Sequence, residues 1–392
     1  MKLLEQIWVV IIMNLRSIPQ RMGMSLATIF AVAAVVGVLL FFLAMGNGFK
    51  DTLEGAGSEN IAVVTRVGSQ SEINSVLSRE QINLMSNAPG VARNNEGTPI
   101  YSGELYVIVD GYKKTNGSKV NIPMRGLSTD GFSLRDNVAI TEGRVFTPGR
   151  NELIVGESVL KQFSGFELGK KITFGKTTWE VVGVFSTGGS AFDSELWADT
   201  RTVQDQFRRG NSFQTMRIQL ETPGDVQSLV DYAEADPRLN IKIETEADYF
   251  SAQGDALNNI VYFGWGISII MGMGALAGAL NTMYTSVAAR AGEIATLRAI
   301  GFSNISAFFG TVAEAIILAL IGGAAGIAII YLMVDGTSTA TIGSSFTQVV
   351  FSFTLSSELL QQGFWLALSI GMIGGFFPAF RAARMPVVTA FE

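Results

Sequence analysis

Four long apolar segments stand out in the pattern of hydrophobic and polar positions along the chain. A helix needs about 20 mostly apolar residues to cross a bilayer. We therefore predict transmembrane spans at residues 24–46, 260–285, 305–334 and 364–381. A shorter apolar run with Trp8 precedes the first span and is too short to cross, so residues 1–23 are predicted to form an interfacial helix on the membrane surface.

Residues 47–259, between the first two spans, show a different pattern of short strand and helix signals. Alternating apolar positions predict strands at 105–109, 152–155, 171–174, 177–185, 216–220 and 241–244. Helices are predicted at 78–86, 199–207 and 224–235. The fold class that follows is an α-helical membrane protein with four transmembrane helices and an α+β domain, carried on stalks, inserted between the first and second spans.

The distribution of Lys and Arg gives the predicted orientation. Short loops rich in these residues stay in the cytoplasm. Basic residues lie in the N-terminal segment, in the segment 286–304 and in the C-terminal segment 382–392, whereas the segment 335–363 has none. We therefore expect a multi-pass protein of the bacterial inner membrane with both termini cytoplasmic, and a periplasmic location for the large domain and for the short loop 335–363.

Composition excludes several classes of function. Only 16% of the residues are charged, against about 25% in soluble domains, which agrees with a membrane protein. The net charge of −6 argues against nucleic-acid binding, which needs clustered Lys and Arg. The chain has no Cys and no His, so zinc sites, thiol nucleophiles and histidine-based triads are excluded. We expect no catalytic, metal-binding or cofactor-binding residues.

One short motif resembles a phosphate-binding loop but does not fit the requirements of such a site. Gly175-Lys176-Thr177 resembles the end of a phosphate-binding loop, but Lys170 stands where that loop requires Gly. The surrounding pattern also predicts a β-hairpin rather than a strand leading into a helix. If ATP drives this protein, a partner subunit must hydrolyse it, and ATP and Mg²⁺ belong to that partner.

Pairs of glycines at a four-residue spacing occur in the last three spans. Small residues one helical turn apart allow close approach of helix backbones. We expect close helix packing, within one chain or between subunits, at the following positions: Gly274, Gly278, Gly322, Gly326, Gly371 and Gly375.

Carboxylates at two places could carry chemistry. Glu314 lies within the third span, where a charged group suggests either a proton relay or, as we favour, a structural bond to a neighbouring helix. Asp193, Glu195 and Asp199 could bind a hard cation, but a solvated loop is the favoured interpretation.

The segment 286–304 has the periodicity of a short helix between two spans. Ile294 and Leu297 recur at helical spacing among Glu293 and Arg298, and Gly301 is placed to end the helix. A β-branched residue at 301 would be strained if φ is positive there, so we expect Gly301→Val to impair function.

The same segment carries a family resemblance. Glu293-Ile294, then Leu297 to Gly301, Glu314, and Gly322-Gly323 with Gly326 resemble the signature of MacB/FtsX-type permeases of ABC transporters. The C-terminal Pro378-Ala379, Arg381 to Arg384 and Pro386, and the N-terminal Asn14 to Ser17, are similar to the same family. The order of one span, a large outer domain and three further spans also fits. Ala288-Ala289 departs from the charged residues of many relatives.

The resemblance implies a role and partners. It implies a permease dimer, with a second copy or a related chain, that works with two copies of an ABC ATPase carried on a separate chain. Contact with the ATPase falls on a coupling helix, which here corresponds to Glu293, Ile294, Leu297, Arg298, Gly301 and Phe302. The outer domain transmits mechanical work in the periplasm, in some relatives through an adaptor and an outer-membrane duct. Membrane lipids surround the spans.

Two alternatives remain open on the sequence. One is a transmembrane signalling subunit that controls a periplasmic enzyme or sensor. The other is an ion-driven secondary transporter, which would be expected to show internal repeats and several buried polar groups.

Overall fold

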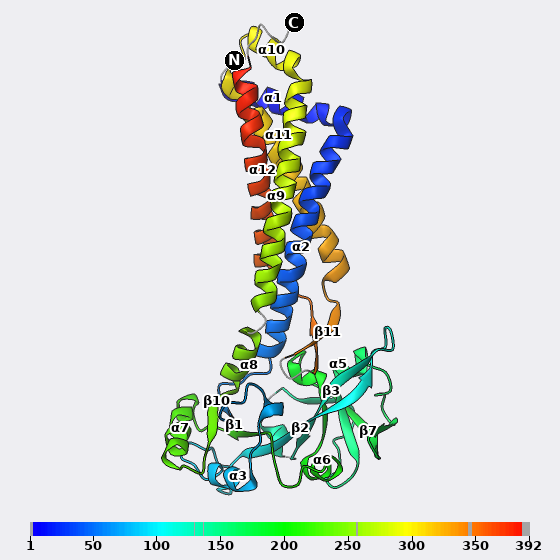
Figure 1. Cartoon of the computed structure of the whole chain (residues 1–392), viewed down its shortest axis with the longest axis vertical. Coiled ribbons are helices and arrows are strands. Elements are labelled where there is room, and N and C mark those ends of the chain that lie inside the picture. The colour runs from blue at the N-terminus through cyan, green and yellow to red at the C-terminus, as the bar shows by residue number, and fades with distance from the viewer. Residues whose placement is uncertain (1–2, 129, 136, 256–257, 344–346, 386–392) are drawn as a thin grey trace. The chain divides into compact units, whose positions relative to one another are not determined.

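The computed structural model describes residues 3–128, 130–135, 137–255, 258–343 and 347–385 (Figure 1). Pro386, part of the C-terminal pattern above, lies outside these residues. The chain divides into a helical unit, residues 1–47, 258–337 and 353–392, and a sheet unit, residues 48–257 and 338–352. Each unit is described by itself.

Long apolar helices make up the helical unit. Within the described residues, four helices have the length and composition needed to cross a membrane, which confirms the predicted number. They contain α2 (Met22–Glu54), α9 (Asn258–Ala289), α11 (Asn304–Val334) and α12 (Ser357–Arg384). Each predicted span lies inside one of them. The stalk expected after the first span is helical, because α2 continues to Glu54.

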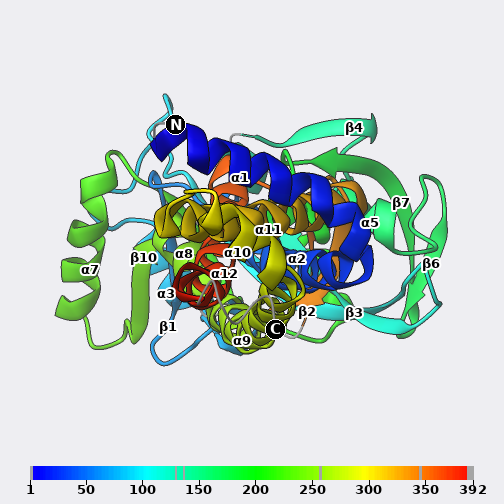
Figure 2. The same ribbon diagram turned by 90° about the horizontal axis from the view of Figure 1, so that it is seen from above.

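An additional helix, α1 (Leu3–Ser17), precedes α2. A short 3-10 turn with Pro19, η1 (Ile18–Arg21), separates the two helices. Figures 1 and 2 show α1 lying crosswise at the end of the bundle, where it packs against α11. Leu4 and Trp8 are 79% and 64% exposed. An exposed apolar face on a helix crosswise to the spans is what an interfacial helix requires.

The sheet unit is built on one mixed sheet of ten strands. Its order is β10-β1-β9-β2-β3-β8-β5-β7-β4, with β6 paired to β7. The strands are β1 (Ile61–Arg66), β2 (Tyr101–Tyr112), β3 (Lys119–Leu127), β4 (Ala139–Gly143), β5 (Glu152–Gly156), β6 (Lys171–Phe174), β7 (Thr177–Ser186), β8 (Leu196–Asp199), β9 (Thr215–Gln219) and β10 (Ile241–Thr245). The pairs β3–β8 and β5–β7 are parallel, and the other pairs are antiparallel.

All six predicted strands are present, and the Gly175-Lys176 segment is the turn of the β6–β7 hairpin, as predicted. Gly175 has φ +61°, which favours glycine at this turn. The predicted helices correspond to α3 (Arg79–Met85), α6 (Thr200–Gln206) and α7 (Val226–Ala235). Shorter helical segments are η2 (Glu72–Asn74), α4 (Asp130–Ser133), α5 (Glu157–Gln162), η3 (Ala191–Ser194), η4 (Pro223–Asp225) and α8 (Glu246–Asp255). The capping box between Ser78 and Gln81 is also formed.

Two hydrophobic cores lie in the sheet unit. One joins β1, β9 and β10 to α3 and α7, and includes Val64, Met216 and Leu229. The other joins β2, β3, β5, β7 and β8 to α5 and α6, and includes Trp179 and Val203. The domain therefore has two lobes that share one sheet.

The segment between α11 and α12 contributes to the sheet unit. The sequence predicted only a short loop at 335–363, but residues 338–352 contain a hairpin of β11 (Ser338–Ile342) and β12 (Gln348–Ser352). Val350 belongs to the second hydrophobic core, and its N–H donates to Ser194 Oγ at 2.9 Å. Strands β11 and β12 are thus part of the sheet unit.

Candidate functional site

The connection between α9 and α11, residues 290–303, has the local structure that its sequence favours. Arg290 precedes the short helix α10 (Ala291–Ala299). Gly301 follows with φ +103°, a conformation that is strained for any residue with a Cβ. Ser303 then caps α11 by accepting a hydrogen bond from the N–H of Ser306 at 3.2 Å. The connection therefore consists of a short helix, a turn at Gly301 and the capped start of α11, and it is not an irregular loop.

One face of α10 is packed into the helical unit and the other is exposed. Ile294 and Ala295 are buried, and Ile294 packs with Val287 of α9 and Ala382 of α12. Glu293 is exposed, and Ile300 is 70% exposed. Glu293 and Ile300 are therefore side chains of this segment that a partner could reach.

Leu297 and Phe302 face inward rather than outward. Both are half-buried and line a small cavity between α1, α9, α10 and α11, together with Val10, Asn14 and other residues of those helices. Arg298 also lines this cavity, and its guanidinium donates to the backbone oxygen of Met385. Of the six residues expected to contact an ATPase, only Glu293 and Gly301 are exposed, and Ile300 was not among the six.

Glu314 is the centre of a polar cluster at one end of the bundle. Its carboxylate is 2.9 Å from Arg290 Nη1 and 3.7 Å from Arg21 Nη1. Ser286 Oγ donates to it at 3.4 Å, and Arg290 also donates to Asn14 Oδ1. We call these five residues the Glu314 cluster. Glu314 is 3% exposed, so two guanidinium groups offset the cost of burying its charge.

The cluster joins elements that are far apart in the sequence. Asn14 belongs to α1, Arg21 to η1, Ser286 to α9 and Glu314 to α11. Arg290, at the start of the connection, reaches both Asn14 and Glu314. A displacement of α10 must therefore either move α1 and α11 or break these bonds. This geometry fits the structural interpretation of Glu314 better than a proton relay.

The glycine pairs separate into two groups. A Cβ at Gly322 would lie 2.7 Å from the carbonyl oxygen of Ile29, so α11 packs backbone to backbone on α2 there, and Gly326 makes a similar approach one turn on. A Cβ at Gly371 would lie 2.8 Å from Ala319 Cβ, and Gly375 also abuts α11. These four positions need glycine for packing within the chain.

Gly274 and Gly278 of α9 differ from the other four. No described atom lies within 4 Å of a Cβ built at either position. The neighbouring Ile269, Ile270 and Met273 are 58%, 67% and 60% exposed. The α9 glycines therefore do not serve packing among the described residues of this chain.

A second polar cluster lies in the sheet unit, on the adjacent strands β9, β2 and β3. Arg125 donates two hydrogen bonds to Glu195, both at 2.7 Å, and one each to Glu72 at 2.7 Å and Glu104 at 2.9 Å. Arg217 donates to Glu246, Glu104 and Glu72, all at 2.7 Å. Arg135 donates to Glu104 at 2.8 Å. We call these seven residues the sheet cluster.

Every member of the sheet cluster is buried. Burial alone would raise the pKa of Glu104, but Arg135, Arg217 and Arg125 outweigh burial and hold that pKa well below its usual range. The same opposition lowers the pKa of Glu72. Glu104 and Glu72 therefore stay ionised at neutral pH, and the cluster ties together the two lobes and the start of α8.

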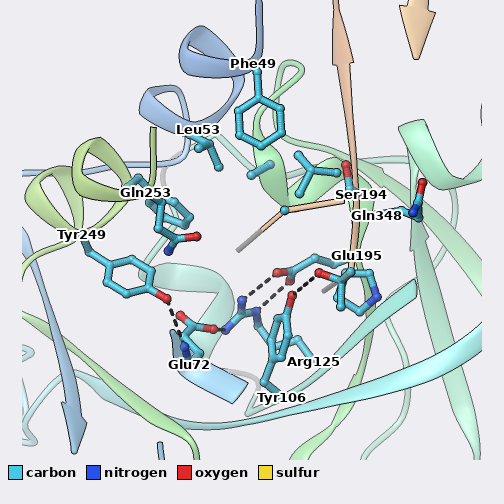
Figure 3. Close-up of a pocket in the computed structure, with 16 residues that line it drawn as sticks. Phe49, Leu53, Glu72, Tyr106, Arg125, Ser194, Glu195, Tyr249, Gln253 and Gln348 are labelled. Carbon is cyan, nitrogen blue, oxygen red and sulfur yellow. Dashed lines mark hydrogen bonds and ion pairs between the residues drawn. The ribbon is translucent and has the colours of Figure 1, made fainter. Parts of the chain in front are cut away.

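Three members of the sheet cluster, Glu72, Arg125 and Glu195, line a small cavity of about 50 Å³ (Figure 3). Tyr106 and Tyr249 face it, and Tyr249 Oη accepts a hydrogen bond from the N–H of Glu72 at 3.2 Å. Phe49 and Leu53 of α2 form an apolar wall. The acidic groups here are satisfied by protein partners, so we assign no ligand to the cavity.

The sequence analysis missed the sheet cluster. It grouped Asp193, Glu195 and Asp199 as a solvated loop or a cation site, and both interpretations are wrong. All three are buried: Glu195 binds Arg125, Asp193 accepts from the N–H of Thr187 at 2.6 Å, and Asp199 caps α6. Among the described residues no group of side chains could hold a metal ion. A signal for the cluster was present, since Glu104, Arg125 and Arg217 interrupt apolar strands.

Comparison with known proteins gives two family matches. Residues 23–236 match the MacB-like periplasmic core domain, and residues 265–387 match the FtsX-like permease C-terminal domain. Together they include β1 to β9 of the main sheet, the α9–α11 connection and Glu314.

Curated relatives differ in how much of their length is matched. The macrolide export ATP-binding/permease protein MacB 1 of Aeromonas hydrophila is 26% identical over 62% of this chain and 38% of its own length. The macrolide export ATP-binding/permease protein MacB of Mannheimia succiniciproducens is 22% identical over 93% of this chain and 58% of its own. The uncharacterized ABC transporter permease YknZ of Bacillus subtilis is 24% identical over 100% of both.

Solved structures with local similarity include two outer domains. The extracellular domain of YknZ from Gram-positive bacteria aligns with a TM-score of 0.36 and 17% identity, over 47% of this chain and 100% of that domain. The periplasmic region of MacB from Actinobacillus actinomycetemcomitans aligns with a TM-score of 0.37 and 15% identity, over 50% of this chain and 94% of that region.

Proposed function

Because the chain belongs to the family of MacB-like and FtsX-like permeases, we propose that it is the membrane permease subunit of an ATP-driven ABC complex in the bacterial inner membrane. In this proposal both termini and the α9–α11 connection are cytoplasmic, and the sheet unit is periplasmic. An ABC ATPase on a separate chain, in two copies, binds ATP and Mg²⁺ and hydrolyses the ATP. The permease does no chemistry itself and transmits the motion to substrates in the periplasm or the membrane.

The observation that carries this proposal is the two-faced α10. Its inner face is fixed by Ile294 and Ala295, and Arg290 links it to Glu314 and Asn14. Its outer edge presents Glu293 and Ile300. A partner that displaces this edge would move α1 and α11 through bonds already in place. A signalling subunit would transmit the same motion to a periplasmic enzyme or sensor instead. In an exporter, the motion could pass to a periplasmic adaptor with an outer-membrane duct.

The Glu314 cluster also supports ATP drive over ion drive. A proton-coupled transporter needs a carboxylate that can gain and lose its proton during the cycle. Glu314 is instead held by two arginine partners, at 2.9 and 3.7 Å, and by the Ser286 hydroxyl at 3.4 Å, which fits a fixed link between helices. An uncoupler of the proton gradient should therefore leave transport intact while ATP is high.

A test of the partner contact uses two variants of the same helix. We would co-purify the chain with candidate ABC ATPase subunits and measure the bound ATPase and its ATP turnover. Ile300→Asp places a charge on the exposed edge and should release the ATPase while the permease remains folded. Leu297→Asp places a charge in the inner cavity and should destabilise the connection. Normal ATPase binding by a folded Ile300→Asp variant would remove α10 from the contact.

Gly301 gives a second test, which concerns stiffness and not contact. Gly301→Val must hold φ near +103° or change the end of α10, and strain of this kind costs about 1–3 kcal/mol. We expect the ATPase to remain bound but transport or ATP turnover to fall. Gly292→Val, at an exposed helical position of the same segment, is the control for the added side chain.

We further propose that the second permease copy packs on the glycine face of α9. The open space at Gly274 and Gly278 and the exposed apolar neighbours support this assignment. The chain has no Cys, so single cysteines can be introduced without background. Gly278→Cys should form an oxidised dimer in membranes, whereas Ile329→Cys, 51% exposed on α11, should not. Dimers from Ile329→Cys alone would place the interface on α11.

A further inference from the structure

A basic groove lies on the surface of the sheet unit, away from both clusters. It has a volume of about 560 Å³ and is formed by the end of β1, residues 76–81 and the loop 209–212. Arg66, Arg79 and Arg209 line it, and no acidic residue does. The whole chain has 34 acidic and 28 basic residues, so this excess of positive charge is local and runs against the net charge.

The arginines of the groove are largely without partners. Within the part of the chain that the structure describes, the guanidinium groups of Arg66 and Arg209 have no ion pair or hydrogen bond. Arg79 makes one long hydrogen bond to Asn211 at 3.4 Å and lies over the Phe213 ring at 5.7 Å. Cations gathered in a concave surface reinforce one another's field and attract anions.

The walls of the groove are fixed by buried bonds. Leu77 and Phe213 exchange backbone hydrogen bonds at 2.7 and 2.9 Å, which join the two sides. Gln204, itself buried, donates to the carbonyl of Ser212 at 2.8 Å, and its own carbonyl accepts from the N–H of Arg209 at 2.8 Å. A groove that is ordered before binding loses less entropy when a ligand enters.

The turn before Arg209 is strained. Arg208 has φ +53°, and among the described residues it is the only non-glycine residue with a positive φ. This left-handed conformation is unfavourable for a residue with a Cβ. A glycine at position 208, like the one at position 210, would adopt this turn without strain. The turn holds Arg209 in place over the groove.

The remaining lining fits a peptide. Gln81, Asn211 and Asn240 supply amide donors and acceptors that match a peptide backbone. Val76, 52% exposed, adds an apolar contact at the rim. Guanidinium groups bind carboxylates through paired hydrogen bonds. We propose that this groove binds an acidic peptide segment of another protein, with two or three carboxylates on Arg66, Arg79 and Arg209. The proposal is independent of ATP drive.

A peptide fits better than a lipid surface. The arginines line a concave site with amide side chains between them, whereas a membrane of anionic lipids is contacted by a convex or flat basic face. The N–H groups of the amides could donate to lipid phosphate oxygens, but the amide carbonyl oxygens are matched best by the N–H groups of a peptide backbone. A peptide satisfies both the charges and the amides.

The test uses the full chain in nanodiscs of zwitterionic lipid and a fluorescein-labelled peptide of alternating Glu and Val. Binding is followed by fluorescence anisotropy. The double variant Arg66→Gln with Arg209→Gln should weaken binding by about tenfold or more, since two charge-assisted contacts are lost. Arg93→Gln with Arg201→Gln removes the same charge from exposed positions outside the groove and should bind as the unmodified chain does.

Three further outcomes are decisive. The same peptide with Gln in place of Glu should not bind, and equal binding of both peptides would overturn the acidic specificity. Equal binding of the Glu peptide to both double variants would show that net charge alone attracts it, which also overturns the proposal. Groove-dependent co-flotation with phosphatidylglycerol vesicles, without peptide binding, would assign the groove to a lipid surface instead. Matching unfolding midpoints of the two double variants exclude misfolding as a cause.

Discussion

The sheet cluster and the Glu314 cluster both bury carboxylates against arginines, but in different frameworks. The sheet cluster has four carboxylates and three guanidinium groups, and its central members stand on the neighbouring strands β9, β2 and β3. Backbone hydrogen bonds between those strands fix the positions of these side chains independently of the ion pairs. Removing one partner therefore leaves an uncompensated charge in a frame that cannot move to relieve it.

The Glu314 cluster has no such frame. It joins α1, η1, α9 and α11, which are separate helical segments connected through side chains at this point. Here the ion pairs are themselves the link between elements. Similar chemistry thus stabilises a domain in one place and links separate helices in the other.

The largest effect is expected from breaking the sheet cluster. Arg217→Met leaves Glu72, Glu104 and Glu246 without one of their donors, and loss of one partner from a buried pair costs about 3–5 kcal/mol. Unfolding can be followed by tryptophan fluorescence, because Trp197 donates to Glu195 within the cluster.

The control for this prediction is Arg238→Met, which removes an arginine that pairs with Asp236 on the surface. Its unfolding midpoint should equal that of the unmodified chain. An Arg217→Met variant that unfolds at the same midpoint as this control would mean that the sheet cluster does not stabilise the sheet unit.

A smaller effect is expected from Glu314→Gln. The amide keeps the shape of the side chain but leaves the positive charges of Arg290 and Arg21 poorly compensated. The expected loss of stability is about 1–3 kcal/mol. Because Arg290 is buried, release of the connection should speed tryptic cleavage after it. ATP turnover of the complex should fall in parallel.

Glu293→Gln is the matched control. Glu293 also pairs with Arg290, at 3.2 Å, but its side chain is 56% exposed. Tryptic cleavage and turnover should change little in this variant. Equal effects of the two substitutions would mean that Glu314 has no special place in holding the connection.

Local patterns predicted much of this fold. Four spans were visible because a bilayer requires long apolar helices, and Gly301 was visible because a helix end needs positive φ. The inward orientation of Leu297 and Phe302 could not be predicted. It depends on where α1 packs against α11, and nothing in the segment 286–304 encodes that contact.

The clusters were less accessible to prediction for the same reason. Glu72, Glu104, Glu195 and Glu246 are separated by long stretches of sequence, and only the strand order brings them to common arginines. The hairpin β11–β12 was missed because its core partners lie on the other side of two spans in the sequence. Glu314 was noticed as a buried charge, but its partners Asn14 and Arg21 were not identified.

Acid should gradually remove the stabilising contribution of the sheet cluster. The pKa of Glu104 and of Glu72 is lowered in the folded state from an ordinary value of 4.5. Their stabilising contribution is therefore complete above about pH 4.5 and is lost as pH falls towards the folded-state pKa. As the pH drops below about 4.5, we expect the unfolding midpoint of the sheet unit to decrease. The decrease should be less steep in Glu104→Gln, because the glutamine has no proton to gain. An equal slope in the two proteins would contradict the assignment.

The smallest effect is expected from Arg21→Gln, which tests whether the Glu314 cluster acts as a unit. Arg21 lies 3.7 Å from Glu314, a longer distance than the 2.9 Å of Arg290, so Arg290 can still compensate the carboxylate when Arg21 is lost. We expect a loss of about 0.5–1.5 kcal/mol and a slight rise in tryptic cleavage after Arg290. Combined with Glu314→Gln, the effects should be less than additive, because both variants remove the same interaction. Additive effects would mean that Arg21 acts through the hydroxyl groups of Ser17 and Ser286, to which it also donates, and that the link from the connection to α2 does not pass through Glu314.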